Sequence, residues 1–505
     1  MTQPVPHRAL ITGCTMVATL MQALDSTIAN VALPYMQGSL STTADQVTWV
    51  LTSYVIASAI MTAPVGWLAA RFGRKNLFIA SLAGFTLTSM LCGAAQSLEQ
   101  MVVFRLAQGV FGAALVPLSQ ATLLDIYPVE RRASAMAIWG MGVMVGPILG
   151  PTLGGYLTEF YNWRWVFYVN LPFGLLAIAG LLACMPAENS DATMRFDWTG
   201  FAVLALGIGA LQLMLDRGQD QDWFTSREIM TEAVLAGLGL YLFVVHMFTA
   251  EHPFLPPAIF RDRNFTAALL MMFAIGMVLL ATSALLAPYL QNLAGYPVET
   301  TGLAMAPRGI GTMAAMVLAG RIGGRIDQRK LMAAGLLLLS WTLYDMSLWT
   351  PDISERRLLV TILIQGFAIG IVFNPLSVTA FTTLAPQLRG DGTALLSLFR
   401  NTGAAIGISV TAFSLAQFTQ AAHADLAAYV TPFNHLLQSG AAGHFYNPAS
   451  AGGAALLDAA IHRQAQIIAY NDDYRLMMVA TLGALLLLPL MRRHRGPVRS
   501  AAAGA

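Results

Sequence analysis

The sequence predicts an all-α membrane protein with two six-helix bundles and two inserted helices. The 505 residues are 56% hydrophobic and only 11% charged, with a mean hydropathy of +0.62, whereas a soluble protein carries about 25% charged residues. The chain contains fourteen apolar runs of about 18 residues or more, the length of a membrane-spanning helix. It also contains one sequence pattern twice, which indicates a duplicated bundle.

The fourteen runs predict fourteen spans. The first is too long for a cleavable signal peptide, carries Asp25, and ends without a small-residue cleavage site. The predicted spans are 9–33, 47–70, 76–96, 99–124, 133–157, 165–185, 198–216, 229–249, 265–290, 301–324, 331–350, 357–385, 392–417 and 474–491.

The duplication begins with the segment Gly66–Lys75, which recurs as Gly320–Arg329, 254 positions later. Gln108-Gly109 recurs at nearly the same offset as Gln365-Gly366, and Pro117 with its neighbours as Pro375. Two patterns with one offset argue against a chance repeat. Duplicated helical bundles are typical of secondary transporters, which hold the substrate between the two halves.

The repeat also predicts the domain organisation. Helices 2 to 5 correspond to helices 10 to 13, so the spans 198–216 and 229–249 are the insertion. Polar residues precede this pair and a Pro-rich stretch follows it, as expected of connectors. We expect an N-terminal bundle at 1–185, the inserted pair and connectors at 186–264, a C-terminal bundle at 265–491 and a tail at 492–505.

The basic residues predict the orientation. With the N-terminus in the cytoplasm, the cytoplasmic segments hold 18 Lys and Arg residues and the outer loops hold 7, as the positive-inside rule requires. We therefore expect an inner-membrane protein with both termini cytoplasmic. The three cysteines, Cys14, Cys92 and Cys184, lie in different spans and indicate neither a disulfide nor a metal site.

The segment 418–473 is an unusually long outer loop. Apolar residues between Leu456 and Ile468 predict an amphipathic helix within it. Four of the eight histidines lie here, but their wide spacing argues against a metal site. The segment is either a solvated cap or a docking surface for another protein.

Glycines recur at every fourth position in the fifth span, which predicts a helix face that a neighbouring backbone approaches closely. The two prolines in the same stretch favour a bend. The residues of this face and its neighbours are Gly142, Gly146, Pro147, Gly150, Pro151, Gly154 and Gly155.

This glycine-proline stretch resembles the antiporter motif of the major facilitator superfamily. The segment Gly66–Lys75 resembles the cytoplasmic loop motif between helices 2 and 3 of that superfamily. Leu24–Pro34 and Arg105–Gly109 are similar to motifs of its fourteen-span drug:proton antiporters, and Trp163–Pro172, Leu215–Gly218 and the long loop to EmrB-type multidrug efflux pumps.

The resemblance implies a set of gating residues, and one neighbouring position departs from the pattern of the superfamily. The superfamily has an acidic residue where Ala70 stands here, so the charge lock of the loop needs other partners or is absent. The gating residues implied by this loop are Gly66, Arg71, Gly73, Arg74 and Lys75.

Asp25 and Arg105 are the strongest candidates for proton coupling. A charge in hydrocarbon costs roughly 2.5–3.5 kcal/mol, so it usually faces a protein interior or a cavity. Both residues lie roughly 10–14 Å below the predicted outer surface, at 1.5 Å per helical residue, which makes contact possible. A static structural ion pair is the alternative.

Other polar and aromatic residues within spans are candidates for the substrate cavity, with packing as the alternative for each. Arg308 and Asp345, near the outer ends of their helices, are able to pair, and His246 is expected to be a packing or lipid-interface residue. The cavity candidates are Asn30, Tyr54, Gln108, Gln120, Trp139, Gln365, Phe367, Phe373, Asn374, Phe399 and Arg400.

The sequence and the resemblance together predict an antiporter that exports hydrophobic or amphipathic drugs in exchange for protons. A uniporter or importer with the same fold is the main alternative. A membrane enzyme lacks support, since no catalytic triad, His-Glu-x-x-His motif or nucleotide loop occurs. We expect no cofactor beyond the coupling proton, no metal and no nucleic acid. The resemblance implies partners, namely a periplasmic adaptor of the EmrA type and an outer-membrane TolC-like channel.

Overall fold

The computed structural model describes residues 7–128, 131–186, 193–322, 326–431, 446 and 450–492. These residues form helices and no strand, which confirms the predicted all-α class. The helices of the first half are α1 (Arg8–Ser39), α2 (Ala44–Val47), α3 (Trp49–Thr62), α4 (Val65–Phe72), α5 (Arg74–Ala94), α6 (Leu98–Gly112), α7 (Leu115–Ile126), α8 (Arg132–Phe160), α9 (Trp165–Tyr168) and α10 (Asn170–Cys184).

The remaining helices are α11 (Trp198–Arg217), α12 (Arg227–Thr249), α13 (Arg263–Pro288), α14 (Val298–Ile322), α15 (Gln328–Met346), α16 (Glu355–Ala380), α17 (Arg389–Ala427) and α20 (Ala451–Ala484). Short helical turns connect or extend them: η2 (Trp223–Thr225), η3 (Pro257–Arg261), η4 (Tyr289–Leu293), η5 (Pro386–Leu388) and η6 (Leu485–Leu490).

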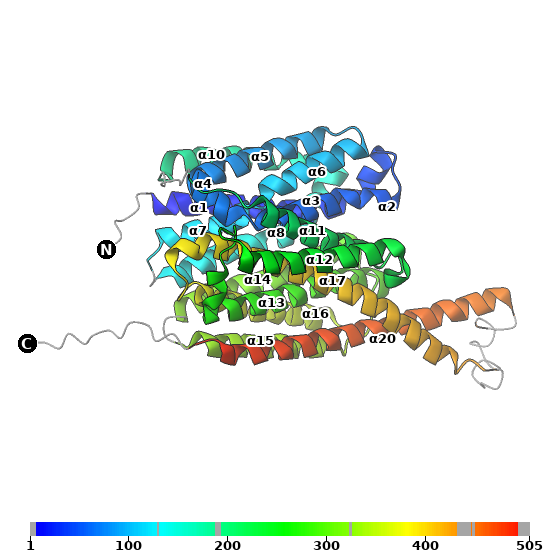
Figure 1. Ribbon diagram of the computed structural model, residues 1–505. Helices are drawn as coiled ribbons and strands as arrows, with labels where there is room; N and C mark the ends of the chain where they lie inside the picture. Colours follow the sequence, from blue (N-terminus) through cyan, green and yellow to red (C-terminus); the bar gives the residue numbers. More distant parts are fainter. Residues whose placement is uncertain are drawn as a thin grey trace, which may run out of the picture.

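The long helices run side by side in one bundle (Figure 1). Among the described residues, eleven helices are long and apolar enough to cross a membrane, and a bent pair makes twelve. Of the other two predicted spans, α8 contributes a shorter apolar segment, Ser134–Val143, and every 18-residue window of α15 contains Arg329, Lys330 and Asp345. Twelve of the fourteen predicted spans are therefore supported. The membrane-spanning role of α8 and α15 stays a prediction.

The bent pair is α3 and α4, which meet at an angle of 60°. Pro64 stands at the break, and a proline cannot continue the hydrogen bonding of the helix before it. The bend turns α4 towards the end of the bundle at which α1 begins and the last helix finishes (Figure 1). We call this end the termini end.

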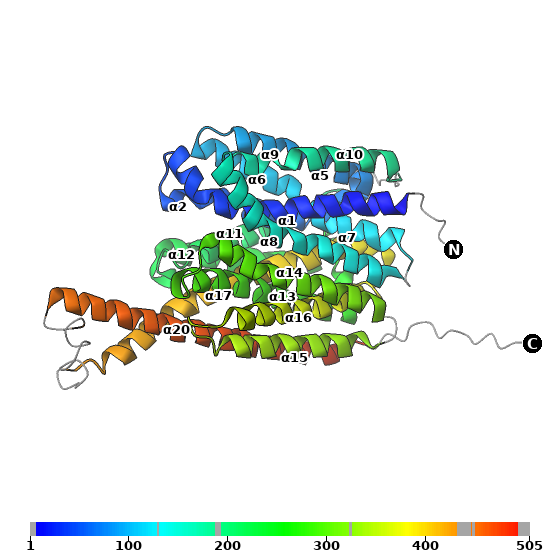
Figure 2. The ribbon, with the colours of Figure 1, turned by 180° about the vertical axis from the view of Figure 1, so that it is seen from behind.

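The helices form two groups that meet along one seam. In the first group α1 packs on α8 and α10, and α10 also packs on α5 (Figure 2). In the second group α14 packs on α16, and α13 on α17. The seam is formed by α8 against α14 and α16, and by α17 against α3, α4 and α7.

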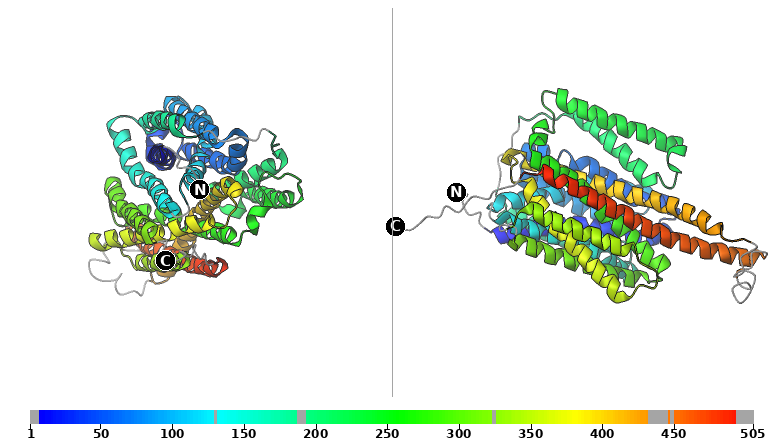
Figure 3. Two further views of the ribbon diagram at one scale, coloured as in Figure 1. Left: turned by 90° about the vertical axis from the view of Figure 1, so that its left-hand side faces the viewer. Right: turned by 90° about the horizontal axis from the view of Figure 1, so that it is seen from below.

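The inserted pair α11 and α12 lies at the edge of the bundle (Figure 3, right). The two helices pack chiefly on each other, while α11 also contacts α3 and α17. His246 of α12, expected as a packing or lipid-interface residue, has a polar partner. Its Nε2 lies 2.8 Å from the carboxylate of Asp197, which also caps the first turn of α11 at Gly200. The pair thus ties the two inserted helices together.

Within the expected outer segment 418–473, the described residues are mostly helical. The helix α17 continues to Ala427 and α20 begins at Ala451, and both extend beyond the bundle opposite the termini end (Figure 1). The helical prediction around 456–468 is confirmed, although Leu456 and Ile468 are exposed. The ring of His423 lies 3.0 Å from the carboxylate of Asp458 and so links the two extensions. His435 and His444 lie outside the described residues.

Candidate functional site

Asp25 is the centre of a buried polar cluster in the first half. Its carboxylate accepts hydrogen bonds from Arg105 (2.7 Å), Gln108 (2.9 Å) and Asn170 (3.3 Å). Asp25 and Arg105 are both 0% exposed. We call Asp25, Arg105, Gln108 and Asn170 the first-half node. The node joins α1, α6 and α10. A change in the charge of Asp25 therefore alters hydrogen bonds between three helices.

Two of the three guanidinium nitrogens of Arg105 have hydrogen-bond partners. Its Nε donates to the carbonyl of Val50 on α3 (3.0 Å), and its guanidinium lies 4.3 Å from the ring centroid of Tyr54. One Nη is buried with no hydrogen-bond partner. Since a buried donor without a partner is costly, this nitrogen is available to a water or a ligand group that enters the node.

Two predicted cavity residues, Tyr54 and Gln108, contact Arg105, so they lie at the first-half node. Their role in a substrate cavity stays a prediction. Asn170 was not predicted as a site residue, although it belongs to the segment Trp163–Pro172 that resembles EmrB-type pumps. Its amide also donates to Ser89 on α5 (3.0 Å). The amide of Asn170 within an apolar run is the signal that could have identified it.

The glycine face of α8 packs against α1, the helix that carries Asp25. A side chain at Gly146 would meet the backbone of Ala23 at 2.5 Å, and one at Gly150 would overlap Thr27. Gly154 faces Ile28 in the same way, and Gly142 is in looser contact with Met16.

Gly155, the neighbour of this face that was grouped with the gating residues, has no atom within 4 Å of a side-chain position. It lies on another side of the helix because it follows Gly154 directly. The helix α8 runs through Pro147 and Pro151, whose side chains lie outside the described part.

At the termini end, α17 closes against the first half. Asp125 on α7 binds Arg74 (2.5 Å) on one side and Arg389 of the second half (2.8 Å) on the other. Gly66 lies against the start of α17, where a side chain would overlap Asp391. Lys75 donates to the carbonyl of Leu182 (3.0 Å). Arg74 and Lys75 therefore both have partners, although Ala70 replaces the acidic residue of the superfamily pattern. We call this set of contacts the termini-end seam.

The remaining gating candidates lie beside this seam. Gly73 has a φ of 82°, a backbone conformation that favours glycine, and it allows α4 to turn into α5. Arg71 lies in the last turn of α4.

Three of the predicted cavity residues meet at the seam between the halves. Trp139 of α8 stacks on Phe373 of α16 with centroids 6.0 Å apart, and both are buried. Asn374 donates to the carbonyl of Met316 on α14 (3.2 Å). The indole nitrogen of Trp139 and the side-chain oxygen of Asn374 are buried without partners, so this region has unused polar groups within an apolar wall.

The other predicted cavity residues are dispersed. Asn30 is exposed and donates to the carbonyl of Ser26, so it is not part of a buried polar site. Gln120 is buried on α7. Phe399 packs at the border of the large core cluster that includes Trp139, and Phe367 packs on a small cluster around Ala315.

Arg308 and Arg400, two cations within predicted spans of the second half, have no acidic partner among the described residues. Arg308 on α14 donates to Gln365 on α16 (3.0 Å from Nε) and to Ser283 on α13. The predicted pairing of Arg308 with Asp345 is wrong, because Asp345 is bound by Arg357 (2.7 Å). Arg400 contacts only the side chain of its neighbour Asn401, at 3.4 Å.

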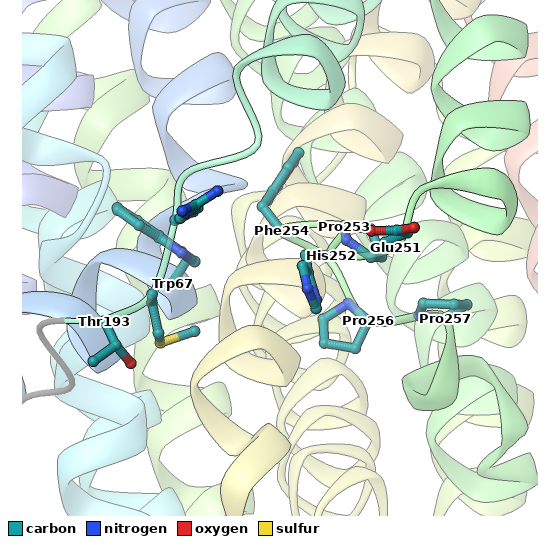
Figure 4. Close-up of a pocket in the computed structure, with 10 residues that line it drawn as sticks. Trp67, Thr193, Glu251, His252, Pro253, Phe254, Pro256 and Pro257 are labelled. Carbon is teal, nitrogen blue, oxygen red and sulfur yellow. The ribbon is translucent and has the colours of Figure 1, made fainter.

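A pocket of about 510 Å³ lies towards the termini end and is separate from these residues (Figure 4). Trp67 of α4 forms one wall, and the connectors on either side of the inserted pair form the others, at 193–195 and 251–257. It contains Arg195, Glu251 and His252, which are charged or titratable. A second, apolar groove lies between α13 and α20.

Known proteins resemble this chain over nearly its whole length. The Major Facilitator Superfamily description matches residues 15–408. The multidrug export protein EmrB of Haemophilus influenzae is 34% identical over 95% of this chain and 94% of its own. The fatty acid resistance protein FarB of Neisseria gonorrhoeae is 34% identical over 96% of both chains.

The fold agrees with these matches. The crystal structure of the human organic anion transporter MFSD10 superposes with a TM-score of 0.57 at 14% identity, over 94% of this chain and 100% of that one. The sequence match and the helical arrangement point to one family, and the chain therefore belongs to the major facilitator superfamily, with EmrB-type proteins among its relatives.

Proposed function

We propose that this protein is a proton-coupled antiporter that exports hydrophobic or amphipathic compounds across the inner membrane. It is a transporter rather than an enzyme, as its family and its relatives named as export proteins indicate. The observation that carries the coupling proposal is the Asp25–Arg105 pair, a carboxylate with no exposure held between helices of one half.

In the proposed cycle Asp25 carries the exchangeable proton. When water reaches the first-half node, the charged carboxylate is solvated and held by Arg105, Gln108 and Asn170. When the node closes around a protonated Asp25, Arg105 loses its counter-ion and the buried network rearranges. Drug and proton then exclude each other from one region, so that export of one requires uptake of the other.

The contact of α8 with α1 supports a link between this node and alternating access. Gly146 touches the backbone at Ala23, two residues before Asp25, while α8 also packs on α14 and α16 of the other half. A rocking motion between the halves moves α8 and so displaces the backbone beside Asp25.

The basic residues support a cytoplasmic location for the termini end. The contacts of Asp125 with Arg389 and of Gly66 with the start of α17 close the seam there. This arrangement therefore corresponds to a conformation closed to the cytoplasm. Release of these contacts is the step that opens the protein to drugs from inside the cell.

The names of two relatives favour apolar substrates. One is a multidrug export protein and the other a fatty acid resistance protein, and the wall formed by Trp139, Phe373 and their neighbours is apolar. An import or uniport function with the same fold remains the competing proposal. Loss of a pH gradient on addition of drug distinguishes antiport from uniport, and proton-driven uptake of drug into inverted vesicles distinguishes export from import.

The test uses purified protein in liposomes with a pH gradient and a fluorescent pH indicator. Antiport predicts that an added substrate such as ethidium dissipates the gradient at a rate proportional to protein content. Liposomes without protein are the control. A gradient that collapses only when an ionophore is added contradicts proton coupling.

We further propose that the extensions of α17 and α20 dock a periplasmic adaptor, which itself connects to an outer-membrane channel. The motivation is a helical hairpin that projects beyond the bundle on the side opposite the termini end, with exposed Leu456 and Ile468. Part of the segment, 432–445 and 447–449, lies outside the described residues.

Deletion of about 440–465 tests this docking proposal. We expect lower drug resistance in cells but unchanged transport by the purified protein in liposomes, because the bundle itself keeps its packing. An equal loss in both assays assigns the hairpin to folding or gating instead.

A further inference from the structure

Asp472 and Asp473, two consecutive residues of α20, have different environments. Asp472 pairs with Arg475 at 2.9 Å, and their side chains are 36% and 56% exposed. Asp473 is 0% exposed. Consecutive residues of a helix point about 100° apart, so that Asp473 shares its face of α20 with the buried residues Ala469 and Met477 rather than with Asp472. One carboxyl group of the pair therefore lies inside the bundle.

The buried carboxyl group has no cationic partner among the described residues. Its one hydrogen-bond partner there is Ser414 of α17, and its Oδ2 is buried without any partner. The hydroxyl groups of Tyr289 and Tyr474 are also buried without partners, so neither donates to Asp473. An ionised carboxylate with one donor and no cation is costly to bury. The environment of Asp473 therefore favours the neutral, protonated carboxyl group.

The contacts of Ser414 support the same assignment. Its Oγ lies within hydrogen-bond distance of three oxygens, which belong to the carbonyls of Val410 (2.9 Å) and Thr411 (3.3 Å) and to the carboxyl group of Asp473. A serine hydroxyl has one proton to donate, whereas a protonated carboxyl group brings another. With a proton on Asp473, the carboxyl group donates to Ser414, and Ser414 donates to Val410. Without that proton, the carbonyls and the carboxylate compete for one donor.

This contact lies where α17 and α20 leave the bundle to form the hairpin. Ser414 is three residues from the end of its predicted span at 417, which is about 5 Å along the helix. Asp473 directly precedes the predicted span that begins at 474. Since Asp473 is fully enclosed, water reaches its carboxyl group only when α20 moves away from α17.

The elements packed on α20 bring no cation to Asp473. These elements are α13, α15, α17, η4 and η6. The only charged residue of α13 is Arg263, its first residue, while η6 and the two turns of α17 on either side of Ser414 have none. Asp345 of α15 is bound by Arg357. The remaining titratable groups of this region are Asp472, Tyr470 and Tyr474 of α20, Tyr289 of η4, and Arg308 of α14, which interacts with Tyr474.

We propose that Asp473 holds a proton in this arrangement and that its carboxyl group, by donating to Ser414, links α20 to α17 at the base of the hairpin. Loss of the proton leaves a carboxylate that needs water, so the two helices separate at this point. A rise in pH on the side of the hairpin therefore loosens the hairpin from the bundle. This proton is not exchanged for drug, so the inference goes beyond the proposed antiport at Asp25.

Infrared difference spectroscopy of the full-length protein in lipid nanodiscs tests for this proton. A protonated carboxyl group has a stretching band separate from those of a carboxylate, and at about pH 5.5 ordinary aspartates, with a pKa of about 3.9, are ionised. We expect Asp473→Asn to lose one carboxyl band completely. Asp472→Asn is the matched control, because it changes the neighbouring exposed carboxylate, and it is expected to keep the band.

Ser414→Ala leaves the carboxyl group in place and tests the direction of the hydrogen bond. If the carboxyl group donates to Ser414, loss of the acceptor destabilises the protonated form, and the band disappears at a lower pH than in the unaltered protein. If Ser414 instead donates to a carboxylate, its removal destabilises the ionised form, and the band persists to a higher pH. This variant also decides the question if Asp473→Asn does not fold.

The melting temperature gives a second measurement. A carboxyl group that keeps its proton in the folded protein but loses it in the unfolded chain contributes stability at low pH that is lost as the pH rises. From about pH 5.5 to about pH 8, we expect the melting temperatures of the unaltered protein and of Asp472→Asn to fall further than that of Asp473→Asn. His423 and Asp458 pair further out on the same helices, and they are unchanged in all three proteins.

Three results overturn the assignment: a set of carboxyl bands that is unchanged in Asp473→Asn, a band that persists to higher pH in Ser414→Ala, or melting temperatures that fall equally in Asp473→Asn and Asp472→Asn. The drug-dependent proton exchange assigned to Asp25 is measured separately in liposomes. Failure of either proposal therefore leaves the other standing.

Discussion

Replacement of Asp25 by Asn separates the structural role of the first-half node from its proposed role in coupling. The substitution removes the counter-ion of Arg105, which is 0% exposed and bonded to Asp25 at 2.7 Å. Breaking a buried ion pair by removing one partner costs about 3–5 kcal/mol, because the other charge stays buried and uncompensated. The Asn amide also presents donors to Gln108 and Asn170, which themselves donate to Asp25.

The double variant Asp25→Asn/Arg105→Gln removes both charges. Since no lone charge remains, its loss of stability is expected to be about 1–3 kcal/mol, well below the sum of the two single losses. We expect unfolding in detergent to show this non-additivity. Proton coupling in liposomes is expected to be lost in Asp25→Asn and in the double variant alike, since neither has a carboxylate at this position.

Two results refute this reasoning. If the double variant is as unstable as the sum of the single variants, the pair does not act as one electrostatic unit. If Asp25→Asn retains drug export driven by the pH gradient, Asp25 does not carry the proton, and attention moves to Asp345.

Two further predictions concern the contacts between helices. Gly150→Leu is expected to reduce transport at least tenfold because a side chain there overlaps Thr27, whereas Gly155→Leu, with open space, transports normally; similar rates in liposomes contradict a close moving contact between α8 and α1. Gly66→Ala is expected to open the termini-end seam, since the new methyl group meets the Asp391 backbone nitrogen at 2.6 Å, while Gly390→Ala, with its nearest atom at 3.5 Å, leaves it closed. The opening is measured by maleimide labelling of a cysteine at the buried Ala394, in a background without the native cysteines. We expect faster labelling in Gly66→Ala, and equal labelling in both variants argues against the opening.

The sequence alone was enough for the fold class, because membrane helices satisfy their own backbone hydrogen bonds and need long apolar runs. It also identified Asp25 and Arg105, since charges within such runs are rare and costly. Similar reasoning pointed to the glycine face of α8. Its partner helix was not predictable, because spacing reveals that a face is flat but not which backbone lies on it.

Tertiary structure alone decided which polar groups share a site. Val50 and Tyr54 of α3 contact Arg105, and Asn170 of α10 donates to Asp25; no local sequence pattern reveals that these residues meet. The same holds for Arg308, which was expected near Asp345 at matching depth but lies against Gln365 and Ser283. Depth along a helix follows from sequence position, whereas the direction in which a side chain points depends on the rotation and packing of its helix among all the others.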